Sequence, residues 1–241
     1  MIVKLRKILY NKKEIYIRGE NMENNSIKKA YASSKNIYDD TLTQSKWWSK
    51  LYIWFFWSGV NDIEIADDVL KSIPNDFNGQ LLDVPVGTGV FTLKKYMALP
   101  NAKIRCVDYS KDMLLQAQKR FSDSNLENII CTQGDVGNLE FNNETFDIVL
   151  SMNGFHAFPE KERAFFETAR VLKKGGMFIG CFYVKGQCRR TDFIVNSFLS
   201  KKGWFTPPFQ SLDELRSVLS SLYTQVEIDN KKSMTFFKCV K

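Results

Sequence analysis

Residues 81–92, with the sequence LLDVPVGTGVFT, constrain the fold of this chain more than any other segment. The apolar start and Asp83 predict a short buried strand that ends at the acidic residue. Gly87 and Gly89 then predict a tight turn, because residues without a Cβ adopt positive φ and let a ligand lie against the backbone. A helix that starts after the turn would present backbone N–H groups to that ligand. The segment therefore predicts a nucleotide pocket.

Strands and helices alternate after this turn, which predicts an α/β fold with a mostly parallel sheet. The last two strands are separated by a turn short enough only for an antiparallel pair. We expect a Rossmann-like, doubly wound, seven-stranded sheet with an antiparallel last strand, and a ligand at the carboxyl ends of its strands. The expected strands are 79–84, 103–108, 128–132, 145–151, 176–184, 222–229 and 233–240, and the helices among them are 89–98, 111–121, 160–172, 188–200 and 211–221.

Three regions are expected along the chain. Residues 1–21 form a basic tail, and residues 22–76 form an N-terminal helical lid with helices at 26–36, 45–58 and 62–73. Residues 77–241 form the ligand-binding domain, with an insertion on the acceptor side at about 185–221. Codons for Arg18-Gly19-Glu20 can spell a ribosome-binding sequence, so we expect Met22 to be the native start.

The net charge of +7 does not indicate nucleic-acid binding, because it is concentrated in the tail. Residues 1–35 contain nine basic and three acidic residues, whereas the rest contains 25 basic and 24 acidic residues. A basic tail of this kind is usually solvated. No apolar stretch of signal-peptide length occurs in residues 1–20.

Composition further limits the kinds of site and the cellular location that we expect. The five cysteines are scattered without CxxC spacing, which favours neither a disulfide framework nor a zinc site and suits a reducing, cytoplasmic location. His156 is the only histidine, so we expect no metal site. The aromatic segment 47–57, which includes Trp54, is too short to span a bilayer. It fits a buried helix, the wall of an apolar substrate pocket, or a membrane-surface helix.

Asp108 ends the second predicted strand about 20 residues after the glycine turn, where a carboxylate can accept hydrogen bonds from both ribose hydroxyls. Enzymes that use NAD share this pairing. They also need a third glycine beside the pyrophosphate, and here that position is Thr92. A ligand with adenosine and no pyrophosphate therefore fits better. After the third strand, Asp135 can accept from an adenine amino group and the Val136 N–H can donate to a ring nitrogen.

These features together resemble a class I S-adenosylmethionine-dependent methyltransferase, in the ubiquinone/menaquinone-biosynthesis-like, methyltransferase type 11 group. The resemblance covers about residues 78–184 and rests on the motifs LLDVPVGTG, CVDYS, QGDV, FDIVLSMNGFHAF and RVLKKGGMFIGCFY, in the family's order. It implies S-adenosylmethionine as cofactor, S-adenosylhomocysteine as product and a small-molecule methyl acceptor as partner. The implied cofactor-binding residues are Asp83, Val84, Pro85, Gly87, Gly89, Asp108, Tyr109, Met113, Asp135, Val136, Ser151, Met152 and Asn153.

Pro85 departs from the family pattern, in which this position is glycine. Proline fixes φ and removes one N–H. Since S-adenosylmethionine places no phosphate on the turn, the loss of that donor is tolerable.

Methyl transfer from a sulfonium needs positioning above all, and a base only if the acceptor must lose a proton. His156 is the candidate base, although a packed loop histidine is the simpler interpretation. Arg189 and Arg190 can hold an anionic acceptor or be solvated. Tyr31, Tyr38, Trp54 and Trp204 are further candidates for the acceptor side or for packing.

Two other functions stay open from the sequence. One is an NAD(P)-dependent Rossmann oxidoreductase, and the other is a regulator that binds S-adenosylmethionine without catalysis. The neutral body of the chain offers no docking surface for an RNA or protein acceptor, so we expect a small, partly apolar acceptor.

Overall fold

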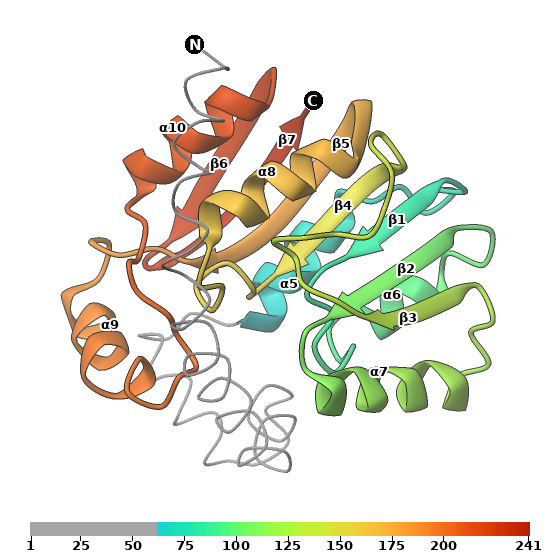
Figure 1. The fold of residues 1–241 in the computed structure, drawn as a ribbon, viewed down its shortest axis with the longest axis horizontal. Helices are drawn as coiled ribbons and strands as arrows, with labels where there is room; N and C mark the ends of the chain where they lie inside the picture. Colours follow the sequence, from blue (N-terminus) through green and yellow to red (C-terminus); the bar gives the residue numbers. More distant parts are fainter. Residues whose placement is uncertain (1–61) are drawn as a thin grey trace, which may run out of the picture.

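The computed structural model describes residues 62–241 (Figure 1). The basic tail, the expected helices at 26–36 and 45–58, and the candidate residues Tyr31, Tyr38 and Trp54 lie outside the described residues.

The described chain folds around one seven-stranded sheet in the order β3-β2-β1-β4-β5-β7-β6. All neighbouring strands up to β5 are parallel, and β7 is antiparallel to both β5 and β6. This confirms the Rossmann-like prediction with its antiparallel last strand. The strands are β1 (Gln80–Asp83), β2 (Lys103–Asp108), β3 (Ile129–Gln133), β4 (Phe146–Met152), β5 (Leu172–Tyr183), β6 (Gln225–Lys231) and β7 (Met234–Val240).

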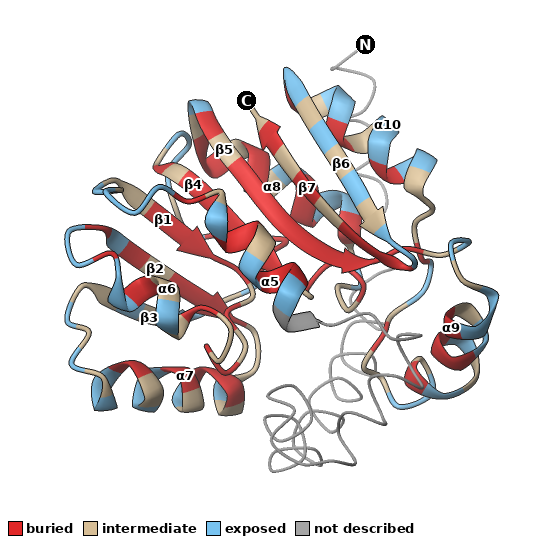
Figure 2. Ribbon diagram, turned by 180° about the vertical axis from the view of Figure 1, so that it is seen from behind, coloured by how far each residue is buried: buried red, intermediate tan, exposed pale blue. Residues whose placement is uncertain are grey.

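Helices cover both faces of the sheet. The helical elements are α5 (Asp62–Lys71), α6 (Leu93–Met97), α7 (Lys111–Asp123), α8 (Lys161–Val171), α9 (Arg189–Ile194), the π-helix η1 (Val195–Leu199) and α10 (Leu212–Leu222). In Figure 1, α8 lies in front of the sheet, and in Figure 2, seen from behind, α5 lies in front of it.

Alternation along the strands produces two hydrophobic cores, one on each face. Leu81 of β1 packs in the core with α5, α6 and α7, whereas its neighbour Leu82 packs in the core with α8 and α10. Strands with both faces covered are buried nearly throughout, as the red central strands of Figure 2 show. The sheet is therefore a rigid base for the loops at its carboxyl edge.

Besides β6, which begins at Gln225 and not at 222, and the helix expected at 188–200, which is divided into α9 and η1, three elements differ from the sequence prediction. The helix expected at 89–98 is shorter, because Gly89 has φ +71 and the chain turns again before α6 begins at Leu93. Strand β5 begins at Leu172 and not at 176, because the Gly175 N–H donates to the carbonyl of Lys241 at 2.9 Å and keeps the chain in the sheet. The register shifts between Phe146 and Ile148 where β4 meets this extension.

The third difference concerns α5, which the sequence analysis assigned to the lid. Its apolar face, which includes Ile65 and Val69, belongs to the main core, and the helix contacts β5 and β7. These side chains repeat at helical spacing, so the periodicity predicts the helix correctly but not its packing partner. Helix α5 is part of the layer that covers the sheet.

The side chains of Phe165 and Phe166, neighbours on α8, provide a direct test of this core. Phe165 is fully buried and stacks on Phe155 with ring centroids 4.0 Å apart, whereas Phe166 is 60% exposed. We expect Phe165→Ala to lower the free energy of unfolding by about 3–5 kcal/mol through a lost aromatic side chain and a cavity. Phe166→Ala should change it by less than about 0.5 kcal/mol. Urea unfolding followed by circular dichroism measures both, and similar losses would contradict this assignment of the core.

Candidate cofactor site

The glycine turn of the predicted pocket follows β1, which lies beside β4 in the middle of the sheet. The chain order reverses between these neighbours, which is the point where ligands bind in sheets of this type. After β1, the Val84 N–H donates to the carbonyl of Leu150 at 2.9 Å, and the Val86 N–H donates to the carbonyl of Val107 at 3.0 Å. The glycine turn is thus held between β4 and β2.

A hydrogen bond links Asp108 directly to the glycine turn. Its carboxylate accepts the Gly87 N–H at 2.8 Å through one oxygen and the Ser110 N–H at 2.8 Å through the other. A Cβ at Gly87 would have no atom of residues 62–241 within 4 Å, so the described part of the chain leaves the space above this residue open. Burial raises the pKa of Asp108 to about 6, against the two N–H donors, which lower it. A carboxylate therefore borders an open space beside bare backbone.

The rest of the turn is held by α7, a contact that sequence reasoning did not identify. Gly89 has φ +71, and a Cβ there would lie 2.6 Å from the ring of Phe121. Arg120 donates to the carbonyl of Thr88. Gly89 is thus required both for its conformation and for close packing. The spacing of residues 120 and 121 on α7 is ordinary, so no local signal identifies them.

Asp83, at the end of β1, is almost fully buried and accepts a hydrogen bond from the Tyr96 hydroxyl of α6 at 2.7 Å. The pKa of Asp83 is raised to about 7, chiefly by burial and also by the nearby charge of Asp108, although the hydrogen bond from Tyr96 lowers it. Two carboxyl groups with raised pKa values therefore lie at one pocket. Such a pair favours a cationic ligand group, whose charge stabilises both ionised forms.

The exits of β2 and β3 are joined beside the same pocket. The Gly134 N–H donates to the Asp108 carbonyl at 3.1 Å, and the Gln133 side chain donates to the carbonyl of Tyr109 at 3.0 Å. Asp135 is exposed and accepts the Gly137 N–H at 2.8 Å, whereas Val136 is buried. The two bonds to Asp108 and Tyr109 hold the residues directly before Asp135 against the end of β2, and the contacts of Asp135 and Val136 with the cofactor stay predictions.

The exit of β4 explains how the chain accommodates Pro85. A Cβ at Gly154 would lie 2.3 Å from Cδ of Pro85, so the two backbones are in close contact. Asn153 has φ +53, and its N–H donates to the carbonyl of Cys181 at 2.7 Å. Ser151 and Met152 are buried. The proline therefore packs the turn against the β4 exit, where a bulkier residue at Gly154 does not fit.

Met113 lies in the first turn of α7 and is buried, and its N–H donates to the side chain of Ser110, the N-cap of the helix, at 3.4 Å. Helix α7 is thus tied to the residue that also binds Asp108. Met113 stays a predicted cofactor contact.

His156 is buried beyond the β4 exit and stacks on Phe205 with centroids 4.0 Å apart. Its Nδ1 accepts the Tyr183 N–H at 3.4 Å. Burial, and then the charge of Lys161, lower its pKa to about 3. The neutral ring accepts at Nδ1 and therefore carries its proton at Nε2, which suits a packing role; catalysis by His156 stays a prediction.

The candidate acceptor residues on the insertion lie apart from the glycine turn. Arg189 and Arg190 are exposed at the start of α9. Trp204 is half-buried against the main core, with Lys202 Nζ 5.1 Å from the centre of its ring. Their roles toward an acceptor stay predictions.

Residues 62–241 contain no cluster of three or more His, Cys, Asp or Glu side chains suited to a metal ion. Within the same residues, no helix has the length and apolar character needed to cross a membrane. All five cysteines are free thiols.

Comparison with known proteins agrees with this geometry. Residues 81–176 match the family model described as "Methyltransferase domain". The chain is 34% identical over 130 residues to the phosphatidylethanolamine N-methyltransferase of Cereibacter sphaeroides, covering 54% of this chain and 56% of that protein. It is 33% identical over 118 residues to the ubiquinone/menaquinone biosynthesis C-methyltransferase of Rickettsia massiliae, covering 47% of each. The chain thus spans about half the length of these relatives.

Among solved structures, phosphoethanolamine N-methyltransferase 2 of Haemonchus contortus in complex with S-adenosyl-L-methionine superimposes with a TM-score of 0.64. The match covers 74% of this chain and 52% of that one at 16% identity, which shows a shared fold. Residues 81–176 are therefore similar to a methyltransferase domain, and the described residues share the fold of a methyltransferase solved with S-adenosyl-L-methionine.

Proposed function

We propose that this protein transfers a methyl group from S-adenosylmethionine to a small, partly apolar acceptor and releases S-adenosylhomocysteine. The observation that carries the proposal is the Asp108 carboxylate, bound to the Gly87 N–H beside the open space above Gly87. The family of the domain and the S-adenosyl-L-methionine bound in the Haemonchus structure support the choice of cofactor.

The residues present fit that cofactor. Each oxygen of Asp108 accepts one backbone N–H and keeps a further lone pair, so the carboxylate can also accept from ribose hydroxyls. The open space above Gly87 can take the amino-acid part, near the buried carboxyl of Asp83. Asp135 and Val136, after β3, can border the adenine. Together these residues complement an adenosine joined to a positively charged group.

The chemistry asks little of the protein besides positioning. When bound, S-adenosylmethionine supplies a methyl group on a positively charged sulfur that departs as a neutral thioether. The turn, tied to β2, β4 and α7, fixes the direction in which an acceptor must approach. The buried exit of β4, through Ser151 and Met152, excludes water from that side.

Aromatic side chains at the same edge support an apolar acceptor. Tyr183, at the end of β5, contacts the rings of Phe205 and Phe209 edge-on, with centroids 5.6 Å and 5.5 Å apart. The names of the two relatives, a phosphatidylethanolamine and a ubiquinone/menaquinone methyltransferase, point to acceptors with apolar parts. Because these three rings are buried in the core, they lie beneath this edge of the sheet, and we infer that a partly apolar acceptor approaches at this edge.

A turnover screen tests the function directly. Protein incubated with S-adenosylmethionine carrying a labelled methyl group, and with fractions of a small-metabolite extract, should transfer label to an organic product. A regulator would bind the cofactor and transfer no label. In a parallel melting experiment, S-adenosylhomocysteine should stabilise the protein and NADH should not, whereas the opposite result would indicate an oxidoreductase.

Asp108→Ala should weaken the binding of S-adenosylhomocysteine by at least about 1–3 kcal/mol, because a charge-assisted pair of hydrogen bonds is lost. Isothermal titration calorimetry measures the affinity. The matched control is Asp123→Ala at the far end of α7, where the carboxylate forms an exposed ion pair with Lys119, and its affinity should equal that of the wild type. Unchanged affinity in Asp108→Ala would place the cofactor elsewhere.

Cofactor affinity should depend on pH through the two carboxyl groups. The pKa values of Asp83 and Asp108 are raised to about 7 and about 6, so acidification neutralises both before most other carboxyls. Affinity for S-adenosylmethionine, which carries positive charge, should fall about tenfold or more between pH 8 and pH 5.5. Titration calorimetry across this range checks the trend, and a flat profile would contradict it.

The effect of the same groups on the unliganded fold has the opposite sign. Their pKa values are higher in the folded state than the ordinary 3.8, so their stabilising contribution is full below pH 4 and is lost as the pH rises through 6–7. The lowered pKa of His156 works in the other direction, because its contribution is full above about pH 6.5 and is lost on acidification toward pH 3. For the pH dependence of these carboxyl groups, cofactor affinity is therefore more informative than the melting temperature of the unliganded protein.

Tyr96→Phe tests the assignment to Asp83. Without the hydroxyl that donates to this carboxylate, the pKa of Asp83 should rise, so the fall in affinity should begin at higher pH than in the wild type. A profile identical to that of the wild type would show that Asp83 does not control the dependence.

A further inference from the structure

Helix α9 and the π-helix η1 form a projecting segment, residues 189–199, that packs on the molecule through one face (Figure 1). Thr191, Ile194, Val195 and Leu199 are buried on that face. The spacing of these four residues is that of a helical stripe, so the opposite side of the segment points away from the core.

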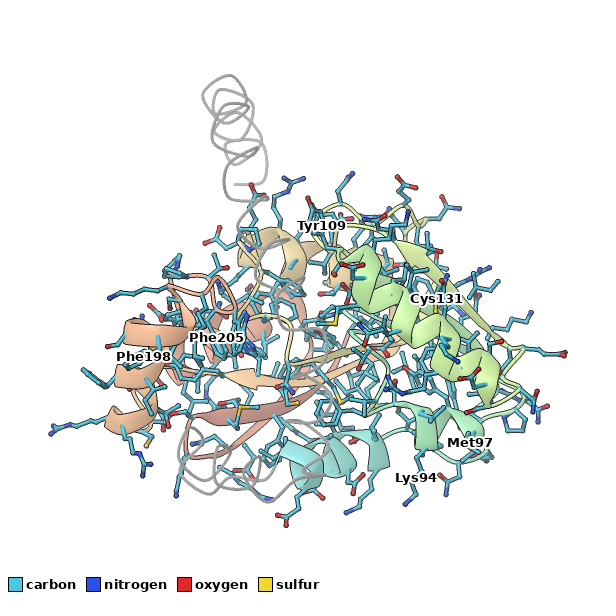
Figure 3. The ribbon with its side chains drawn as sticks, turned by 90° about the horizontal axis from the view of Figure 1, so that it is seen from below. Lys94, Met97, Tyr109, Cys131, Phe198 and Phe205 are labelled. Atoms are coloured by element: carbon cyan, nitrogen blue, oxygen red, sulfur yellow. The ribbon has the colours of Figure 1, made fainter. Side chains whose placement is uncertain are left out.

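Two large aromatic side chains lie on the outward side. Phe193 is 67% exposed and Phe198 is 57% exposed. In Figure 3, Phe198 lies on the outer part of this segment and Phe205 lies on its inner side. The other large exposed apolar residues of the described chain, Met97, Leu115, Ile130 and Phe166, are each on a different element. Single exposed apolar residues are ordinary, whereas a pair on one short segment marks a contact surface.

The π-helical turn brings the two rings toward one side. In an α-helix, residues five apart point in clearly different directions, because one turn takes 3.6 residues. A π-helix forms i→i+5 hydrogen bonds, as between the Ser200 N–H and the carbonyl of Val195 at 2.9 Å, and so moves residue i+5 closer to the direction of residue i. The wider turn therefore places Phe193 and Phe198 on a common outward side.

The charge around the pair is basic. Arg189, Arg190, Lys201 and Lys202 are all exposed at the two ends of the segment. Asp192, the only acidic residue between 186 and 210, is half-buried and has a partner at each carboxylate oxygen: it accepts the Tyr183 hydroxyl at 2.6 Å and the Gly186 N–H at 3.0 Å. The segment thus combines two exposed aromatic rings with exposed basic residues at both of its ends.

We propose that the outward side of residues 189–202 docks on an anionic lipid bilayer. Phenylalanine rings that enter the headgroup region, flanked by Arg and Lys side chains, are the side chains of a membrane-surface segment. A stable protein partner would need about 800 Å² of complementary surface, which two rings on a convex segment do not supply. A bilayer requires no such shape complementarity.

The position of the segment determines which side of the domain would face the bilayer. Tyr183, which anchors Asp192, ends β5 at the same edge of the sheet as the glycine turn after β1. Docking would therefore bring the acceptor side of the domain close to the bilayer. The proposal concerns the surface alone and does not depend on methyl transfer.

Sedimentation with vesicles tests the proposal on the full chain. Vesicles of phosphatidylcholine with 30% phosphatidylglycerol (about a third anionic lipid) should bind the wild type at least about tenfold more strongly than pure phosphatidylcholine, and 0.5 M NaCl should weaken that binding several-fold. Phe193→Ser combined with Phe198→Ser should lower the partition coefficient at least about tenfold. Equal binding of this double variant and the wild type would overturn the proposal.

Two controls make the result specific. Phe166→Ser removes an equally exposed phenylalanine from α8 and should bind vesicles like the wild type. Hydrogen exchange on vesicles should show protection at residues 189–202, which separates this surface from any contribution of the basic tail. Protection confined to other residues would overturn the proposal.

The same samples distinguish the remaining outcomes. Light scattering after size exclusion should give the same mass for the wild type and the double variant, whereas a dimer that the substitutions dissociate would make this side a self-association surface and overturn the proposal. The double variant should bind S-adenosylhomocysteine like the wild type. If the wild type itself does not bind S-adenosylhomocysteine, the proposed function is refuted, and the result with vesicles still stands.

Discussion

The hydrogen bond from the Gly87 N–H to the Asp108 carboxylate is the interaction on which the site depends. It joins the turn after β1 to the end of β2, so two strand exits move as one unit. The bond from the Gly134 N–H to the carbonyl of Asp108 adds the exit of β3. Because the strands beneath are covered on both faces, these short bonds are anchored on a rigid base, and the open space above Gly87 keeps its shape.

The charges of two buried carboxyl groups favour a positively charged ligand in the space above Gly87. Asp83 and Asp108 are both buried, and the charge of one raises the pKa of the other. The domain thus holds two carboxyls that are costly to ionise together in the absence of a cation. A positively charged ligand relieves that cost, which connects the proposed cofactor to a measurable dependence of affinity on pH.

The segment that follows β5 has one side packed on the core and one side that faces outward. Its inner side continues the core through residues such as Ile194 and Leu199, and Asp192 ties it to Tyr183. Its outer side carries Phe193 and Phe198 between basic ends. One short segment thus has a structural face and an interaction face, and the π-helical turn decides how the two are divided.

Much of this protein follows from the sequence alone. Hydrophobic alternation and glycine spacing predict the doubly wound, mostly parallel sheet, its antiparallel last strand and the turn beside Asp108. These features depend on residues that are close together in the sequence. The limits of α6 and β5, the place of α5 on the sheet, the contact of Gly89 with Phe121 and the fit of Pro85 against Gly154 depend on residues distant in sequence. Close packing between such residues has no local signature, so the sequence determined the cofactor class and the outline of the fold, and only the tertiary structure decided which side chains hold the turn.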